Sequence, residues 1–315
     1  MANSEAGGMG MSDPVKSILR TIGPVGVIGL GNMGLAMAVN LVGSGFEVIG
    51  TDLIAESRNA LNKAGGTAVA DACEVGKRCR HIILSLPSEA ALHAVCADLS
   101  ANGARGTIVI ETGTLPLTGK RKACDLLAGY GMTLLDCPLS GTGAQARNRD
   151  LAVYASGNPK AIQECLLIID GFARVCYDLG EFGNGTKMKL VANLLVAIHN
   201  VAAAEGILLG VRSGLDPATV VKVIGDGAGS SRMFQDRGPS MVNRTWDEAM
   251  ITNTVWQKDL KLIGEALLAA ASSAPLFSAT IPIYTAALTS GHADHDTAAV
   301  YEVLERMAGL NTHAS

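Results

Sequence analysis

The chain has 315 residues, of which 48% are hydrophobic and 4% aromatic, and its formal net charge is −4. This length is enough for two domains or one large domain. The negative charge, with no basic run that interleaves with aromatic residues, argues against a nucleic-acid-binding surface. The 7 cysteines include no Cys-x-x-Cys pair, which predicts reduced thiols in a cytoplasmic protein rather than a disulfide framework or a zinc site.

Residues 1–22 are expected to form a flexible N-terminal extension, because they are polar and small and lack the apolar stretch of a signal peptide. One later segment, residues 190–210, is apolar enough to resemble a membrane span. It is interrupted by four polar residues between Asn193 and Glu205, which are costly in lipid. We therefore expect a helix that is buried by protein rather than by a membrane.

The first predicted elements form a dinucleotide-binding pattern. Residues 25–29 are a short apolar strand that runs into Gly-x-Gly-x-x-Gly, and a helical segment follows directly. In this context the first glycine makes a tight turn, the second lets the backbone approach a pyrophosphate, and the third lets helix and strand pack closely. The helix N-terminus offers free N–H groups to the phosphates. The predicted cofactor-binding residues of this loop are Gly29, Leu30, Gly31, Asn32, Met33 and Gly34.

The second predicted strand, residues 46–51, ends at Asp52. A carboxylate at this position accepts hydrogen bonds from the adenosine ribose and repels a 2′-phosphate. Leu53 follows, where an NADP-binding chain often carries arginine. The pattern thus favours NAD over NADP. The ordinary interpretation, that Asp52 caps a helix over residues 54–64, is compatible with this role.

Strands and helices alternate from Pro24 to about Gly180, and strand signals stop after Gly183. This alternation predicts an α/β fold with a doubly wound (Rossmann), mainly parallel sheet, followed by a smaller all-α domain that a long helix joins to it. The expected division is an extension (1–22), an NAD-binding Rossmann domain (23–182), a long interdomain helix (183–212) and an all-helical C-terminal domain (213–315). The expected strands cover residues 25–29, 47–51, 81–86, 107–111, 133–136, 151–155 and 174–178.

Several strand ends carry candidate site residues, since ligands bind at the carboxyl edge of such sheets. Leu86 and Pro87 are placed to wall the cofactor, and Thr114 to bond the nicotinamide ribose; an ordinary strand end and a simple turn are equally good local interpretations. The polar, glycine-rich loop 136–143 offers backbone N–H groups and the hydroxyls of Ser140 and Thr142 to a substrate carboxylate. A flexible connection is the alternative for this loop.

The start of the long helix carries Lys189 and Asn193, which are four residues apart and share one helix face. A lysine transfers a proton to a substrate oxygen if burial or a nearby positive charge lowers its pKa. A lysine near a helix start is by default a solvated charge, and Lys187 fits that default. Lys258 is a candidate cofactor contact, with a Lys258–Asp259 surface pair as the ordinary alternative. The histidines after Gly291 have no accompanying third cluster, so no metal site is predicted there.

These motifs together resemble the β-hydroxyacid dehydrogenase family, which includes 3-hydroxyisobutyrate dehydrogenase and tartronate semialdehyde reductase. The resemblance spans nearly everything from Val25 to Met307. The family's Asp-x-Pro-x-Ser-Gly-Gly is similar to residues 136–142, its Gly-x-Gly-x-x-x-Lys-x-x-Asn-Asn to residues 183–193, and its Lys-Asp-Leu to residues 258–260.

The resemblance implies an NAD-dependent hydroxyacid dehydrogenase in which Lys189 is the catalytic acid and base and Asn193 its partner. It also implies substrate contacts and cofactor contacts. The implied substrate-binding residues are Ser140, Gly141 and Thr142, and the implied further cofactor contacts are Leu86, Pro87, Thr114 and Lys258.

Several positions depart from the family pattern and leave the substrate side chain open. Thr142 replaces the second signature glycine, Ala192 the first paired asparagine, and Gly113 a frequent serine, while Arg149-Asp150 stands where Gly-Thr is common. The rival enzymes are imine reductases, which usually lack the lysine, and 6-phosphogluconate dehydrogenases, which carry histidine in place of Ala192 and a longer helical domain. A non-catalytic NAD(P)-sensing protein is the rival of another class. A homodimer or homotetramer is expected because the helix after Lys189 is apolar on all sides.

Overall fold

The computed structural model describes residue 19 and residues 21–310, and the chain divides into two compact units, Met1–Thr186 and Lys187–Ser315. The expected N-terminal extension therefore lies almost entirely outside the described residues. Leu19 and Ile22, at its end, pack against the core of the first unit.

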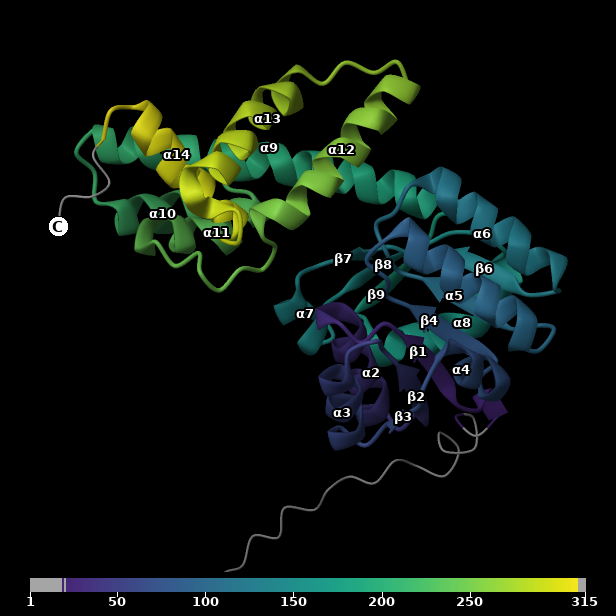
Figure 1. The fold of residues 1–315 in the computed structure, drawn as a ribbon. Helices are drawn as coiled ribbons and strands as arrows, with labels where there is room; N and C mark the ends of the chain where they lie inside the picture. Colours follow the sequence, from purple (N-terminus) through teal and green to yellow (C-terminus); the bar gives the residue numbers. More distant parts are fainter. Residues whose placement is uncertain (1–18, 20, 311–315) are drawn as a thin grey trace, which may run out of the picture. The chain divides into compact units, whose positions relative to one another are not determined.

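The first unit is built on a six-stranded parallel sheet with the order β3-β2-β1-β4-β5-β6 (Figure 1). This is the doubly wound order, which confirms the predicted fold class. Its four-residue inner strands are buried over almost their whole length, because helices cover both faces of a parallel sheet. The strands are β1 (Val25–Ile28), β2 (Val48–Thr51), β3 (Thr67–Ala68), β4 (His81–Leu84), β5 (Ile108–Glu111) and β6 (Thr133–Asp136).

The helices of the first unit pack in two groups, each with its own apolar cluster against the sheet. One contains Met37 of α2 and Ile162 of α8, and the other contains Val75 of α4, Leu92 of α5 and Leu127 of α6. Asn158 caps α8 through the N–H groups of residues 160 and 161, and Pro159 is its first residue, as the sequence predicts. The helices are α2 (Asn32–Gly43), α3 (Ala55–Lys63), α4 (Ala72–Arg78), α5 (Glu89–Asn102), α6 (Leu117–Gly129), α7 (Gly143–Arg147) and α8 (Pro159–Phe172).

The last strands of the first unit do not extend the main sheet. They form a separate three-stranded sheet of β7 (Leu139–Ser140), β8 (Ala152–Ala155) and β9 (Val175–Asp178), in which β7 and β8 are antiparallel. The sequence predicts β8 and β9 but neither β7 nor β3. Both missed strands have two residues, which is too short for a hydrophobic period to show.

The described part of the second unit is helical apart from an isolated bridge between Thr252 and Asp296, which agrees with the predicted all-α domain. Asp216 caps α10, and Pro217 begins it. The sequence does not predict α11, because a helix interior rarely contains proline and Pro239 lies inside it. The elements are α9 (Asn184–Arg212), α10 (Pro217–Gly225), α11 (Arg232–Asn243), α12 (Asn253–Ala269), α13 (Pro275–Ala287), η1 (Leu288–His292), η2 (Thr297–Ala299) and α14 (Val300–Met307).

Helix α9 has 29 residues and, among the described residues, is the one helix long and apolar enough to cross a membrane. Ala197 and Ile207 lie in the apolar core of the second unit. Asn200 is fully buried, and its amide donates hydrogen bonds to the hydroxyl of Tyr284 and the carbonyl of Thr297. Both hydrogen bonds of the buried Asn200 NH2 group go to neighbouring protein groups, as expected for a core helix of a folded domain.

Candidate active site

The three motif glycines of the first unit have different surroundings. Gly29 has φ of +90°, and a Cβ there would lie 2.2 Å from the Ser85 carbonyl oxygen. A Cβ on Gly34 would lie 1.9 Å from the carbonyl oxygen of Gly29, whereas a Cβ on Gly31 would meet no atom within 4 Å. Gly29 and Gly34 are therefore required by packing, and the space at Gly31 suits the close approach of a ligand.

The start of α2 fits the pyrophosphate of a dinucleotide. Gly31 occupies the N-cap position, where it offers no side-chain cap to the helix. Asn32 and Met33 follow in the first turn, which carries the unpaired N–H groups and the positive end of the helix dipole. A cavity of about 470 Å³ opens beside this loop, and two residues that the sequence analysis did not single out, Ser57 and Arg147, line it together with Leu30 and Gly31.

Asp52 follows β2 directly and is bonded to the glycine loop. Its Oδ2 accepts a hydrogen bond of 2.6 Å from the Leu30 N–H, and its Oδ1 accepts one of 2.8 Å from the Ile54 N–H. The side chain does not cap α3, whose N-cap residue is Ile54. The guanidinium of Arg58 bonds the carbonyl oxygens of Asp52 and Leu53, so a cation also lies at the end of β2.

The strand register brings the other predicted segments to one sheet edge. Ile28 pairs with Leu84, Leu84 with Glu111, and Glu111 with Asp136, so the residues that follow these strands emerge side by side. Leu86 and Thr114 are half-buried at this edge, and Pro87 is exposed.

The substrate-loop candidates lie on a short strand and helix rather than on a flexible connection. Ser140 is in β7 and is half-buried, and Gly141 has φ of +138°, which favours glycine. Thr142 is the N-cap of α7 in a capping box with Gln145: its N–H donates to Gln145 Oε1 at 2.9 Å. Because that N–H already has a partner, Ser140 is the better candidate to hold a carboxylate.

Arg149, where the resemblance leads us to expect glycine, has φ of +57°. This conformation is unfavourable for a residue with a Cβ. Its guanidinium donates to the Asp170 carbonyl oxygen at 2.5 Å, which ties the loop to α8.

The second unit carries the lysine candidates. Lys189 is half-buried and Asn193 is 4% exposed, both in α9. Burial lowers the pKa of the Lys189 ammonium; the negative charge of Asp259 opposes that effect and the positive charge of Lys258 adds to it. A lysine with a lowered pKa is better suited to accept a proton than a solvated one.

Asp259 is not half of a surface pair, contrary to the ordinary interpretation of Lys258-Asp259. Lys258 is exposed, but Asp259 is 6% exposed and its Oδ1 has no hydrogen-bond partner. Burial raises the pKa of Asp259, and the charges of Lys258 and Lys189 lower it. The sequence offers no signal that Asp259 is buried, because a lysine-aspartate pair on a helix is usually solvated.

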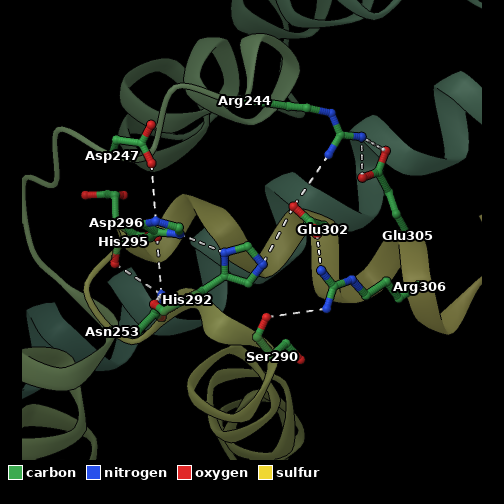
Figure 2. A network of polar contacts seen from close by, with 10 residues as sticks. All are labelled: Arg244, Asp247, Asn253, Ser290, His292, His295, Asp296, Glu302, Glu305 and Arg306. Atoms are coloured by element: carbon green, nitrogen blue, oxygen red, sulfur yellow. Dashed lines mark hydrogen bonds and ion pairs between the residues drawn. The ribbon is translucent and has the colours of Figure 1, made fainter. Parts of the chain in front are cut away.

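The histidine-rich segment after Gly291 belongs to a polar network in the second unit (Figure 2). The Nδ1 atoms of His292 and His295 are 2.9 Å apart, and His292 Nε2 lies 3.6 Å from Glu302 Oε2. Asp247 lies 3.2 Å from His295 Nε2. Within the described part of the chain, no group of three or more histidine, cysteine or acidic residues is arranged to hold a metal ion.

Two family models match successive parts of the chain. Residues 24–180 match the NAD-binding domain of 6-phosphogluconate dehydrogenase, and residues 183–304 match the NAD-binding domain of NADP-dependent 3-hydroxyisobutyrate dehydrogenase.

Individual relatives cover nearly the whole chain. L-threonate dehydrogenase of Cupriavidus necator is 32% identical over 89% of this chain and 95% of its own length. The NAD-dependent L-serine dehydrogenase of Pseudomonas aeruginosa is 28% identical over 90% of this chain and 99% of its own. The structure of Mycobacterium tuberculosis 3-hydroxyisobutyrate dehydrogenase with L-serine superposes with a TM-score of 0.82 at 27% identity, over 90% of this chain and 99% of the other.

Proposed function

Because the chain belongs to the 3-hydroxyisobutyrate dehydrogenase-like family of hydroxyacid dehydrogenases, we propose that it transfers hydride between a small hydroxy acid and NAD, with Lys189 as general acid and base. The observation that carries the proposal is Lys189 itself, a half-buried lysine whose pKa burial lowers, in a family of oxidoreductases.

In this proposal the protein supplies binding groups and one mobile proton. When bound, the nicotinamide accepts the hydride in oxidation and supplies it in reduction. The neutral Nζ of Lys189 takes the substrate hydroxyl proton in oxidation, and its ammonium returns a proton to the carbonyl oxygen in reduction. The Asn193 amide holds the same oxygen or orients Lys189, and Ser140 and Gly141 hold the carboxylate, which fixes the reacting carbon.

The experiment that tests this function is a substrate screen. The purified protein is mixed with NAD and a panel of 3-hydroxyisobutyrate, glycerate, L-threonate and L-serine, and with reduced NAD and tartronate semialdehyde. We expect a change in absorbance of the reduced cofactor with at least one of these acids, since relatives bear the names of threonate and serine dehydrogenases. Binding of NAD without turnover of any acid would favour the non-catalytic sensing protein instead.

We propose NAD as the preferred cofactor because of Asp52. The N–H groups of Leu30 and Ile54 bond its carboxylate, and in a dinucleotide-binding fold a carboxylate after the second strand would repel a 2′-phosphate. Arg58 binds backbone carbonyls beside it and is the group that would favour NADP.

Exchange of Asp52 for asparagine tests this preference. We expect Asp52→Asn to raise the ratio of kcat/KM with NADP to kcat/KM with NAD by about tenfold or more, which corresponds to roughly 1.4 kcal/mol. The matched control is Asp71→Asn, which makes the same change in an exposed cap of α4. A wild-type protein that already prefers NADP would contradict the proposal.

The charges around Lys189 predict two opposite changes in the pH profile of oxidation. The rate rises with pH as Lys189 loses its proton. Asp259 raises the pKa of Lys189 and Lys258 lowers it. We therefore expect Asp259→Asn to move the midpoint of kcat to lower pH and Lys258→Met to move it to higher pH, measured at saturating NAD. Shifts of the same sign in both variants would contradict the assignment of that midpoint to Lys189.

We also propose that the protein works in the cytoplasm as a homodimer or homotetramer. All 7 cysteines are free thiols. Val191, Leu195 and Leu209 of α9 are exposed apolar side chains, which another copy is able to cover. Light scattering tests the oligomeric state.

A further inference from the structure

A fully buried ammonium lies between two carboxylates at the carboxyl edge of the main sheet. Lys120 Nζ of α6 is 2.6 Å from Glu111 Oε2 and 2.7 Å from Asp136 Oδ1, and all three side chains are 0% exposed. Glu111 and Asp136 are the last residues of the neighbouring strands β5 and β6. We call these three residues the buried ion triad. Nothing in the sequence analysis predicts it.

The triad holds the first turn of α9. Thr186 donates to the Asp136 carboxylate twice, from its N–H to Oδ2 at 2.8 Å and from its hydroxyl to Oδ1 at 2.7 Å. Ser156 donates to Asp136 Oδ2 at 3.2 Å and accepts the N–H groups of Gly183 and Gly185. The N–H groups at this helix end are thus bonded to Asp136 and Ser156, and a carboxylate at a helix N-terminus is favourable.

The approach of α9 to Asp136 is close enough to require glycine. A Cβ on Gly185 would lie 2.3 Å from the carbonyl oxygen of Tyr154 and 2.7 Å from that of Asp136. The helix start is therefore packed backbone to backbone against the ends of β6 and β8 and has little freedom to shift.

The other side of the triad holds the turn after β5. Lys120 Nζ donates to the Gly113 carbonyl oxygen at 2.7 Å, and the Gly113 N–H donates to Glu111 Oε1 at 2.8 Å. This turn leads to Thr114, the proposed contact of the nicotinamide ribose. The loop with Ser140 begins directly after Asp136. One cluster of charges is thus bonded to two segments of the proposed site and directly precedes a third in the chain.

Burial of three charges is an expensive way to obtain stability, because their desolvation offsets most of the attraction between them. Well-packed apolar side chains often replace a buried ionic group without loss of stability, so the triad is weak evidence for a role in stability alone. The charged groups add geometric specificity, since each of their hydrogen bonds fixes the orientation of the segment that it contacts.

We propose that Lys120, Glu111, Asp136 and Thr186 are positioning residues of the dehydrogenase, which set the first turn of α9 and thereby the direction of Lys189. Lys189 follows Thr186 by three residues in the same helix, which places both on one face. The expected effect on catalysis rests on the proposed function. The expected effect on the start of α9 rests on the hydrogen bonds alone.

The test compares Thr186→Val, which keeps the side-chain shape and removes the hydroxyl donor, with Thr186→Ser, which restores that donor. The matched control is Thr107→Val. Thr107 is 0% exposed, its hydroxyl bonds the Ala104 carbonyl oxygen, and it lies before β5 at the opposite end of the strand. All variants are measured for kcat, for KM of NAD, and for hydrogen–deuterium exchange of the peptide covering residues 183–190.

We expect Thr186→Val to lower kcat by roughly ten- to a hundredfold, because small misplacements of a catalytic group are costly. KM for NAD should stay near the wild-type value, exchange in residues 183–190 should accelerate, and Thr186→Ser should recover most of kcat. Thr107→Val should change neither kcat nor that exchange. Unchanged exchange in Thr186→Val, or an equal loss of kcat in Thr107→Val, would overturn the inference. If the wild-type protein oxidises no acid on the panel, the proposed function fails, while the exchange measurement still decides whether Asp136 and Thr186 fix the helix.

Discussion

Replacement of Lys189 by methionine is expected to lower kcat by about 10²–10⁴-fold, the usual contribution of a general acid or base. Methionine keeps most of the aliphatic length and removes the proton carrier. The dissociation constant of the reduced cofactor, measured by titration of its fluorescence, should change less than about twofold, since the proposed pyrophosphate site is at the start of α2.

The physical reason lies in the surroundings of the lysine. Burial lowers its pKa, so a larger share of neutral amine is present near neutral pH than in a solvated lysine. Asn193, one turn further along α9, is buried and presents an amide on the same helix face. In the proposed mechanism, the two side chains would supply a proton acceptor and a hydrogen-bond donor for one substrate oxygen.

Lys187→Met is the control for this experiment. Lys187 is exposed and lies two residues before Lys189 in the same helix, on a different face. It should retain kcat within about twofold, because an exposed charge contributes little to a barrier at another face of the helix. Near-normal turnover in Lys189→Met would remove Lys189 from the mechanism and leave the family assignment intact.

The second large effect is expected on stability. Lys120→Met leaves the carboxylates of Glu111 and Asp136 buried side by side without their cation, and loss of one member of a buried ionic group costs about 3–5 kcal/mol. We expect a correspondingly lower free energy of unfolding in urea. Circular dichroism should follow the transition, because both tryptophans, Trp246 and Trp256, lie in the second unit and do not report on the sheet.

Two further variants make this result specific. Lys122→Met changes an exposed lysine of the same helix and should alter the free energy of unfolding by about 0.5 kcal/mol or less. Adding Glu111→Gln to Lys120→Met removes one unpaired charge and should restore part of the loss. If Lys120→Met is no less stable than Lys122→Met, the charge of Lys120 does not contribute to the free energy of unfolding as expected.

The sequence predicted the elements that have strong local signals. Inner strand β1 has no polar residue, β4 is apolar after His81, and Gly29 to Gly34 follow β1 in the order that a dinucleotide-binding loop requires. Asn158-Pro159 and Asp216-Pro217 marked helix starts correctly, because capping depends on neighbouring residues alone.

The buried charges could not be predicted in this way. Lys120 lies in Lys120-Arg121-Lys122, which has the composition of a solvated face. Its partners, Glu111 and Asp136, end the strands on either side of α6, and local composition does not show that the side chains meet. Asp259 is adjacent to an exposed lysine, and only the packing of α12 shows that it is buried. Such burial depends on tertiary contacts that local composition does not encode.

The unequal surroundings of the motif glycines have a consequence for how such a motif should be interpreted. The fold requires glycine at positions 29 and 34, since a methyl group at either would collide with backbone even in the free protein. At position 31 the free protein has room for a methyl group, so the fold does not require glycine there. In the proposed site, that methyl group would occupy the space that a pyrophosphate needs. We therefore expect that a chain that keeps Gly29 and Gly34 but replaces Gly31 by alanine would keep its fold and bind the dinucleotide more weakly.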